Sequence, residues 1–417
     1  MAMVLPGRSY SETLLTQAPD GDPVTMPLFI GHTFPDAAIA VTAMQPVCVE
    51  SLTQAISYFG PLGTLAYSLR HFFENGGLQC YVLSLGAGRE DPVARISDLI
   101  TALKTPLMLD TLLSDDKSGL VLVPELSELN DVSTSSLPTE GAGMTAFDAD
   151  ALWYQAWDAL LTLCHQTQQR FALLELPEDP VQAAVLTQQS FSADLCQCGA
   201  SWWPRLETSY EDEASAHILL SPLPAVAAAI QRSAHDKGVW KAPANITLAK
   251  TLRPTRSILT SQALLNNRGI SCNLIRSFVG NGVRLWGCRT LLNEKNGSWR
   301  YIQTRLLINS VERYLSTLAR AYLFEPNNAQ TWMKLKGQVW TWLRQQWLAG
   351  AFFGTVEDEA FSLNIGLGET MSENDIRDGK MILQVRLALL APAEFIDINL
   401  TLDLHDGTAS AQIGGPS

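Results

Sequence analysis

Histidine is the residue type that most often supplies acid–base or metal chemistry, and this chain has six of them. No two histidines lie four residues apart, the spacing that would place both on one helix face toward a metal. Two of them fall late in predicted helices, where a charged imidazole interacts favourably with the helix dipole. We therefore predict structural roles for all six, which are His32, His71, His165, His217, His235 and His405.

The seven cysteines predict buried thiols in a reducing compartment. Their number is odd and they are scattered along the chain, whereas a disulfide framework needs paired positions. Cys196 and Cys198 form one close pair, but no second pair follows at the spacing of a zinc site. The sequence therefore predicts neither a metal site nor a cofactor.

None of the common catalytic or nucleotide-binding motifs is present. The chain lacks a G-x-x-x-x-G-K-[ST] phosphate loop, an H-E-x-x-H helix and a G-x-S-x-G elbow. The glycine pairs at 86–88 and 280–282 are incomplete as dinucleotide loops, and we interpret them as turn glycines with positive φ. The acidic clusters at 211–213 and 357–359 are typical of solvated loops. A sequence gives no spatial pairing, so a carboxylate dyad stays open.

Charge is distributed unevenly along the chain. The net charge is −13 over 417 residues, which argues against general binding to nucleic acid or an anionic membrane. Residues 273–348 nevertheless contain eleven Arg and Lys and only three acidic residues. Such a block favours a surface that meets an acidic partner, although a solvated helical face gives the same pattern. Neither a transmembrane helix nor a signal peptide is expected, because no suitable apolar run occurs.

Strands and helices alternate over roughly the first 240 residues. Residues 1–25 have few large apolar groups and several turn residues, which predicts an extended arm. The alternation predicts a mostly parallel sheet covered by helices, and residues 130–143 read as an exposed loop. The predicted strands are 26–31, 80–85, 120–123, 171–176 and 217–220, and the predicted helices are 51–59, 65–73, 151–168, 181–190 and 224–237.

The last third of the chain combines two long helices with strands. The first predicted helix, 302–323, turns Leu307, Val311, Leu315, Leu318 and Tyr322 inward. The second, 329–348, begins after the capping residue Asn328 and has an apolar side formed by Trp332, Leu335, Val339, Trp342 and Leu343. Alternating segments at 360–365, 381–388 and 394–402 predict strands, and 406–417 reads as a soft tail.

Residues 269–327 contain a series of closely spaced motifs: GISCNLIRSFVGNGVRLWGCRTL at 269–291, a tryptophan at 299 and FEPN at 324–327. This series resembles the C-terminal core of contractile tail sheath proteins. The family pattern is close to GIN.IR.F.G.G..VWGART, followed by a tryptophan, a basic amphipathic helix and FEPN. Weaker similarities lie at 72–77 with 80–82 and at 392–396, so the pieces occur in the family's order. The matching residues of the main run are Gly269, Ile270, Asn273, Ile275, Arg276, Gly280, Gly282, Trp286, Gly287, Arg289, Thr290, Trp299, Phe324, Glu325, Pro326 and Asn327.

The resemblance implies an α/β (mixed α+β) tail-sheath fold made of five segments. These are an N-terminal arm (1–25), an N-terminal part of the sheath core (26–86), an α/β middle domain (87–245), a C-terminal mixed α+β core domain (246–392), and a C-terminal strand arm with its tail (393–417).

It also implies a structural protomer and not an enzyme. Such a protomer polymerises around an inner tube and contracts to drive the tube through a target cell envelope, in a phage tail, a tailocin or a related injection particle. The expected partners are other copies in a stack of rings, the inner tube, baseplate and cap proteins, and sheath paralogues where a machine encodes them. The particle would assemble in the bacterial cytoplasm before release. A doubly wound α/β enzyme and a type VI secretion sheath component stay open as alternatives.

Two sets of contact residues follow from the resemblance. Both arms are expected to add strands to neighbouring protomers, through Pro6, Gly7 and Tyr10 at one end and Phe395, Ile396 and Ile398 at the other. In the family a C-terminal-domain helix meets the inner tube by charge, and the candidate here is helix 329–348.

Three basic residues of that helix are the expected tube contacts. Lys336 and Arg344 lie about two turns apart, and Lys334 lies on another side. No acidic residue occurs between Pro326 and Gly354, so we expect these cations to be free for acidic tube residues.

Overall fold

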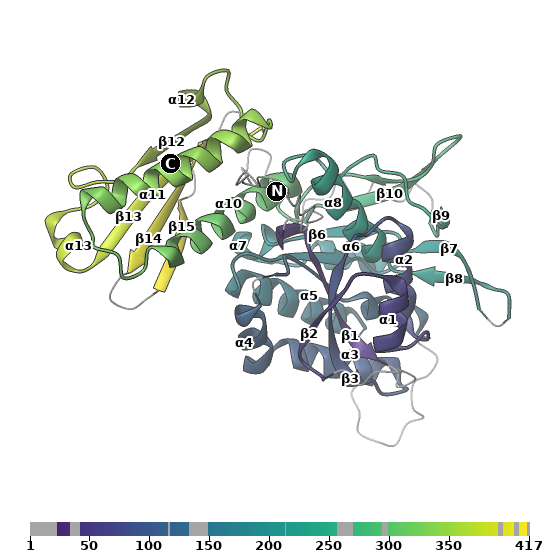
Figure 1. The fold of residues 1–417 in the computed structure, drawn as a ribbon. Helices are drawn as coiled ribbons and strands as arrows, with labels where there is room; N and C mark the ends of the chain where they lie inside the picture. The colour runs from purple at the N-terminus through teal and green to yellow at the C-terminus, as the bar shows by residue number, and fades with distance from the viewer. Residues whose placement is uncertain are drawn as a thin grey trace, which may run out of the picture.

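Two lobes joined by a long helix make up the protein (Figure 1). The computed structural model describes residues 23–33, 42–115, 117–132, 149–212, 214–256, 270–293 and 299–390, together with the backbone of 395–403 and 408–414. The larger lobe is a helix–sheet–helix structure, and the smaller lobe is a four-stranded sheet crossed by one long helix. The predicted mixed α/β architecture is confirmed.

An eight-stranded sheet organises the larger lobe, in the order β11-β10-β6-β5-β4-β1-β3-β2. The six inner strands run parallel, and the antiparallel strands β2 and β11 form its edges. Strands of three predicted segments thus share one sheet, and the proposed segment boundaries stay a prediction. The strands are β1 (Pro27–Thr33), β2 (Pro46–Val49), β3 (Cys80–Ala87), β4 (Leu120–Leu122), β5 (Phe171–Glu175), β6 (Gly199–Trp203), β10 (Asn273–Phe278) and β11 (Gly282–Trp286).

Helices cover both faces of this sheet. Successive side chains of each buried strand point to opposite faces, so both faces present apolar side chains on which helices pack. Leu28 and Ile30 of β1 belong to one apolar cluster, whereas Phe29 between them belongs to the other. The first cluster packs on α3 (Pro92–Leu103), α4 (Pro106–Ser114), α5 (Ala149–Gln166), α6 (Pro180–Thr187) and α7 (Ala193–Cys196). The second packs on α1 (Leu52–Phe59), α2 (Thr64–Glu74) and α8 (Leu223–Lys237).

Helices α3 and α4 were missed by the sequence analysis. Each begins with a proline that follows a capping side chain: Asp91 accepts hydrogen bonds from two backbone N–H groups of α3, and Thr105 accepts one from Met108 in α4. Asp-Pro and Thr-Pro are recognised helix-start signals, so the information was present in the sequence.

Strand β8 (His217–Leu220) does not join the parallel sheet, which corrects the prediction for 217–220. It pairs antiparallel with β7 (Leu206–Glu211), and β9 (Thr251–Pro254) completes a separate three-stranded sheet. Only residues 212–216 connect β7 to β8. A parallel crossover needs a dozen or more residues, so this short link permits only a hairpin.

Helix α10 (Ile302–Ala321) connects the lobes. Its buried arginines anchor it beneath the larger lobe: Arg305 donates to the Gln168 carbonyl at 3.3 Å and Arg313 donates to the Ser118 carbonyl at 3.1 Å. Both carbonyls lie just before parallel strands of the sheet. The same helix contacts β14 and β15 of the smaller lobe, so it belongs to both lobes at once.

The smaller lobe packs α11 (Ala329–Leu348) on a sheet of order β12-β13-β14-β15. Asn328 caps α11 as predicted, and Leu335, Val339 and Leu343 are fully buried. Residues 406–417 were expected to be a tail, yet the backbone of Thr408–Gly414 within this range forms β15. The remaining elements are β12 (Phe361–Asn364), β13 (Lys380–Ala388), β14 (Phe395–Asp403), β15 (Thr408–Gly414), α12 (Glu357–Ala360) and α13 (Glu373–Arg377).

The carboxyl ends of β1 and β4 mark the point where the strand order of the sheet reverses, which is where doubly wound enzymes bind ligands. Here the protein's own side chains fill that point. The Glu125 carboxylate accepts a hydrogen bond from the His32 backbone N–H at 2.5 Å and lies 2.9 Å from His32 Nδ1. A Cβ on Gly31 would lie 2.8 Å from the same carboxylate. The two side chains therefore occupy this point by contacting each other.

Glu175 ends the neighbouring strand β5 and is fully buried. Within the described part of the chain, the Ser221 hydroxyl is the nearby group that can hydrogen-bond its carboxylate, and no bond there reaches good geometry. Burial raises the pKa of Glu175 to about 8, and the nearby Ser221 hydroxyl and Arg205 guanidinium lower it by less. The side chain is therefore protonated at neutral pH.

Replacing Glu175 by Gln should weaken the loss of stability at alkaline pH. The folded pKa lies above the ordinary value of 4.5, so the stability linked to this proton is complete below about pH 4.5 and is lost as the pH rises through about 8. We expect the fall in Tm between pH 6 and pH 9 to be smaller by about 2–4 °C in Glu175→Gln. Glu373→Gln on exposed α13 is the control and should fall like the wild type. An equal fall in both variants would contradict a buried, protonated Glu175.

Truncating Leu335 tests the packing of α11. Leu335→Ala removes a fully buried side chain and should cost about 2–5 kcal/mol of unfolding free energy. Met333→Ala, on the same helix but 75% exposed, should change it by less than about 0.5 kcal/mol. Guanidinium unfolding followed by tryptophan fluorescence measures both, because four of the eleven tryptophans lie in α11.

Candidate interaction surfaces

The described residues hold no cluster of three or more His, Cys, Asp or Glu that could bind a metal ion. Cys196 and Cys198 are both buried, and burial raises the pKa of the Cys196 thiol to about 11. These two thiols are therefore protonated and packed against the core. None of the described helices has the length and apolar character needed to cross a bilayer.

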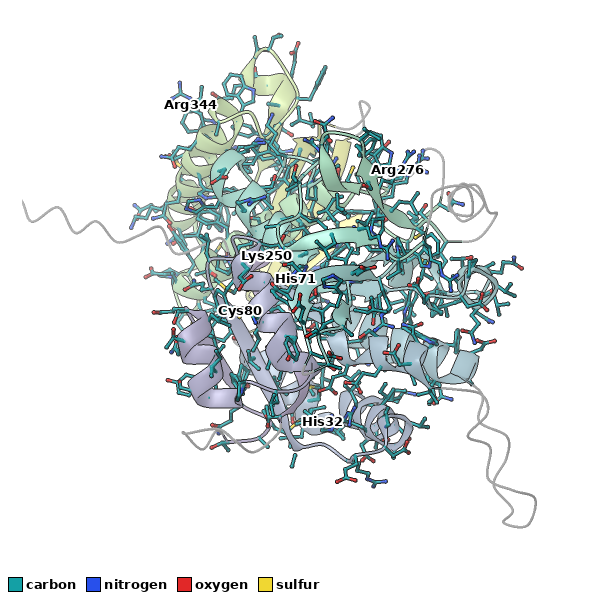
Figure 2. All side chains as sticks on the ribbon, turned by 90° about the vertical axis from the view of Figure 1, so that its right-hand side faces the viewer. His32, His71, Cys80, Lys250, Arg276 and Arg344 are labelled. Atoms are coloured by element: carbon teal, nitrogen blue, oxygen red, sulfur yellow. The ribbon has the colours of Figure 1, made fainter. Side chains whose placement is uncertain are left out.

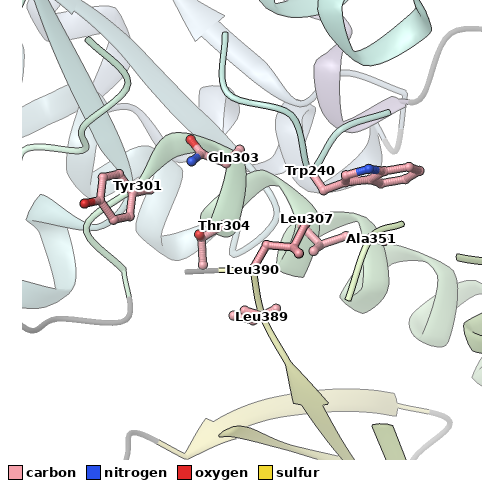
Figure 3. A pocket seen from close by; sticks show the side chains of 8 residues that line it. All are labelled: Trp240, Tyr301, Gln303, Thr304, Leu307, Ala351, Leu389 and Leu390. Atoms are coloured by element: carbon pink, nitrogen blue, oxygen red, sulfur yellow. The ribbon is translucent and has the colours of Figure 1, made fainter. Parts of the chain in front are cut away.

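A cleft of about 280 Å³ lies where the two lobes meet (Figure 3). Trp240 and the first turns of α10 line it from the larger lobe, and Ala351 and Leu389 line it from the smaller one. Its polar lining consists of hydroxyl and amide groups from Tyr301, Gln303 and Thr304. A nucleophile with an adjacent base, which covalent catalysis needs, does not occur among these lining residues.

The family motif builds a fixed junction around Asn273 at the start of β10. The Asn273 amide donates to the Arg289 carbonyl at 2.7 Å and to the Ser201 carbonyl at 3.2 Å, and its oxygen accepts from the Arg289 N–H at 2.8 Å. Gly287 has a φ of 126°, and a Cβ there would lie 2.6 Å from the Asn273 side-chain oxygen. Both the backbone conformation and the close approach therefore require glycine at this position.

Arg276 and Trp286 form an exposed corner beside this junction. The Arg276 guanidinium lies 5.4 Å from the ring centre of Phe278 and 5.6 Å from that of Trp286. Trp286 is 39% exposed. A cavity of about 480 Å³ adjoins the corner, and its lining includes Trp286, Gly287 and Arg289. These residues belong to one motif in the sequence, and the structure brings them together.

The rest of the motif connects elements around α10 and α11. The Trp299 carbonyl accepts a hydrogen bond from Thr290 at 2.8 Å, and Arg305 of α10 lies 5.0 Å above the Trp299 ring. Asn327 donates to the Lys380 carbonyl at 2.9 Å and accepts from the Trp332 indole at 2.7 Å. Asn327 thus joins the turn between the two helices to β13. Glu325 and Pro326 are exposed, and their side chains make no comparable hydrogen bond to another element within the described part of the chain.

The three basic residues predicted on α11 have different surroundings. Lys334 is exposed and Lys336 is partly exposed, and neither has an ion-pair partner within the described part of the chain. Arg344 differs: its Nε lies 3.3 Å from Glu357, and its guanidinium lies 5.2 Å from the ring centre of Trp340. The expectation that no acid neutralises Arg344 is therefore wrong.

Glu357 could not be recognised as a partner because it lies nine residues after Leu348, where α11 ends. The chain turns between these two residues and brings Glu357 back against the helix. The acidic cluster that contains it is also not a solvated loop: Glu357 begins α12, and the Glu359 carboxylate accepts two hydrogen bonds from Thr355, at 3.0 and 3.1 Å. An acidic run directly after a Gly-containing turn is an ordinary helix-start signal, so α12 itself could have been predicted, although its contact with Arg344 could not.

The predicted arm residues are only partly within the structure. Pro6, Gly7 and Tyr10 lie outside the described residues. Phe395, Ile396 and Ile398 belong to β14, whose backbone pairs with β13 of the same chain. Strand donation between protomers stays a prediction.

Solved structures of similar proteins identify the family of this chain. No family model matches the sequence, and a search of curated proteins finds no match. Among solved structures, one chain of the anti-feeding prophage (AFP) baseplate in contracted state is 76% identical, with a TM-score of 0.82, over 97% of this chain and 100% of that chain.

Two further AFP chains are more distant. One comes from the six-fold symmetrised baseplate and one from the helical sheath in contracted state, and they are 25% and 24% identical to this chain. Each alignment covers 94% of this chain and 98% of the other, with a TM-score of 0.64. High identity over nearly the whole of one relative, and a fold shared with a helical sheath, show that this chain belongs to the contractile tail sheath family, as a structural protomer of a contractile sheath.

Proposed function

We propose that this protomer occupies the baseplate end of a contractile sheath and does not fill its whole length. The observation that carries the proposal is the contrast in identity: 76% to one chain of the AFP baseplate, but 24% to the chain of the AFP helical sheath. A baseplate chain at 25% identity indicates that such baseplates also contain the more distant type of chain. Two sheath-type proteins in one particle imply a division of positions.

A ring at the end of a sheath meets two different neighbours. One side contacts the next sheath ring, and the other contacts baseplate proteins, whereas an internal ring contacts identical rings on both sides. Different partners select different surface residues on a shared fold. This requirement accounts for a chain that keeps the sheath fold while its sequence differs widely from that of the helical sheath.

The protomer would act without catalysis, with contraction driven by conformational energy stored during assembly. Support comes from the absent phosphate loop in the sequence and from the crevice at β1 and β4, which His32 and Glu125 fill. Assembly would take place in the bacterial cytoplasm, followed by release within the particle. Besides other copies of itself, its partners would be the inner tube, baseplate and cap proteins and a sheath paralogue.

Contact with the inner tube would be made by α11. After the correction for Arg344, Lys336 is the leading candidate, with Lys334 second, because both lack an ion-pair partner among the described residues. Single exposed pairs contribute only about 0–1 kcal/mol each. A ring repeats each pair, so the sum holds the extended state while every contact remains easy to break.

Counting copies in purified particles tests the position. Quantitative mass spectrometry should find a small and constant number of copies of this chain, whatever the length of the particle. Antibody–gold labelling should mark one end, next to the baseplate. Copy number that scales with particle length, or labelling along the whole sheath, would contradict the proposal.

Reversing one charge on α11 tests the tube contact. Lys336→Glu places a carboxylate opposite acidic tube residues, and we expect extended, tube-filled particles to fall about three- to tenfold relative to contracted ones. The matched control is Arg377→Glu on α13, which is 71% exposed and should leave the ratio unchanged. Counting both states by negative-stain microscopy gives the result, and an unaltered ratio for Lys336→Glu would remove α11 from the tube interface.

A further inference from the structure

The β11 edge of the large sheet presents an exposed face with the composition of a protein-binding site. Leu274 of β10 is directly opposite Trp286 of β11, so both side chains point to the same face of the sheet. Leu274 is buried in the cluster that α5 and α7 cover. Two and four residues further along β10, Arg276 and Phe278 lie on this face and are partly exposed. At this corner the sheet therefore extends beyond the helices that pack on it, and its side chains are partly exposed.

Arg276 is held in place but has no carboxylate partner in the described part of the chain. It lies over the rings of Phe278 and Trp286, and its Nε is buried without a hydrogen-bond partner there. Arg289, at the rim of the adjoining cavity, also lacks an ion pair within the described residues. Tryptophan and arginine are the residues most enriched at binding hot spots, and a pre-ordered guanidinium loses little entropy when it pairs.

The opposite edge of the sheet carries a face with complementary chemistry. On α4, Leu107 and Leu113 are 58% and 57% exposed, and the exposed Asp110 lies midway between them at a spacing of three residues. Residues three apart lie on the same side of a helix. Asp110 has no ion pair within the described residues, and a groove of about 620 Å³ separates α4 from the residues that lead into β2.

These two faces lie on opposite sides of the larger lobe (Figure 1), where α4 and the β10–β11 hairpin are far apart. Figure 2 shows that Arg276 is also well separated from Arg344, so this corner is distinct from the predicted tube-facing helix. A contact between two different patches of identical chains repeats around a ring or along a helix, whereas a contact between identical patches ends in a dimer.

We propose that neighbouring protomers of the sheath join through these faces: the Arg276–Trp286 corner of one copy binds the Leu107–Asp110–Leu113 face of α4 in the next copy. Arg276 pairs with Asp110, and the two leucines pack on Trp286 and into the cavity beside it. Arg276 and Asp110 have opposite charges, neither has an ion pair within the described residues, and each has exposed apolar side chains beside it, so the two faces complement each other and select a second copy as the occupant. This proposal requires only that the chain is a sheath protomer. It does not depend on whether the protomer occupies the baseplate end of the sheath.

A charge exchange tests the pair in particles produced from the complete gene set. Arg276→Glu and Asp110→Arg should each lower incorporation of this chain into particles by about tenfold, since each places like charges together. The double variant should recover to within about threefold of wild type, because the attraction is restored in reversed polarity. The control combines Arg276→Glu with Glu90→Arg, another exposed acid of the same lobe, and should not recover.

Cross-linking gives a second reading that does not need a disruptive variant. A photo-reactive phenylalanine analogue in place of Phe278 should capture, in assembled wild-type-length particles, the tryptic peptide 105–117 of another copy. The contact would be overturned if the single variants were incorporated normally, or if the double variant were incorporated no better than the Glu90 control. Cross-links that reach only other peptides would overturn it as well. If one of these results occurred while this chain kept a small, constant copy number at the baseplate end, the interface would be rejected and the proposed position would stand.

Discussion

The burial of α10 against both lobes is the constraint on which the rest of the molecule depends. Its apolar side includes Leu306, Ile308 and Val311, all almost fully buried, and its polar side inserts Arg305 and Arg313 beneath the sheet. A buried guanidinium is costly unless its N–H groups find acceptors, so the carbonyls of Gln168 and Ser118 specify where the helix can lie. Because α10 also contacts β14 and β15, this one placement sets the position of α11 relative to the larger lobe.

Long periodic elements could be predicted from the sequence, and contacts between distant segments could not. Helices α5, α8, α10 and α11 have enough turns for their apolar stripes to stand out, and their bounds agree closely with those expected. Helix α4 is only nine residues long and exposes Leu107 and Leu113, so its pattern is weak. Strand β8 has the composition of a buried strand, and only the short link before it reveals its antiparallel pairing.

The same limit applies to the functional residues. The motif around Arg276, Trp286 and Gly287 was visible in sequence because the family preserves its order of residue types, but its geometry was not. Nothing local predicts that Asn273 closes onto Arg289, or that Glu357 returns to Arg344, since both partners come from other elements. The crevice at the strand reversal shows the converse. The topology alone would suggest a ligand site, and only the positions of His32 and Glu125 show that it is filled.

Asn327 has a mechanical consequence. Its amide and carbonyl groups connect the α10–α11 turn to both β13 and α11. Further along the two helices, the Tyr314 and Trp342 rings stack with centres 4.1 Å apart. A force applied to the smaller lobe would therefore be shared by two hydrogen bonds and a ring stack acting in parallel, and no single bond would have to bear it alone. Parallel attachments must fail together, which makes the turn stiff under shear. Displacement would then pass from one lobe to the other with little lost to bending of the turn.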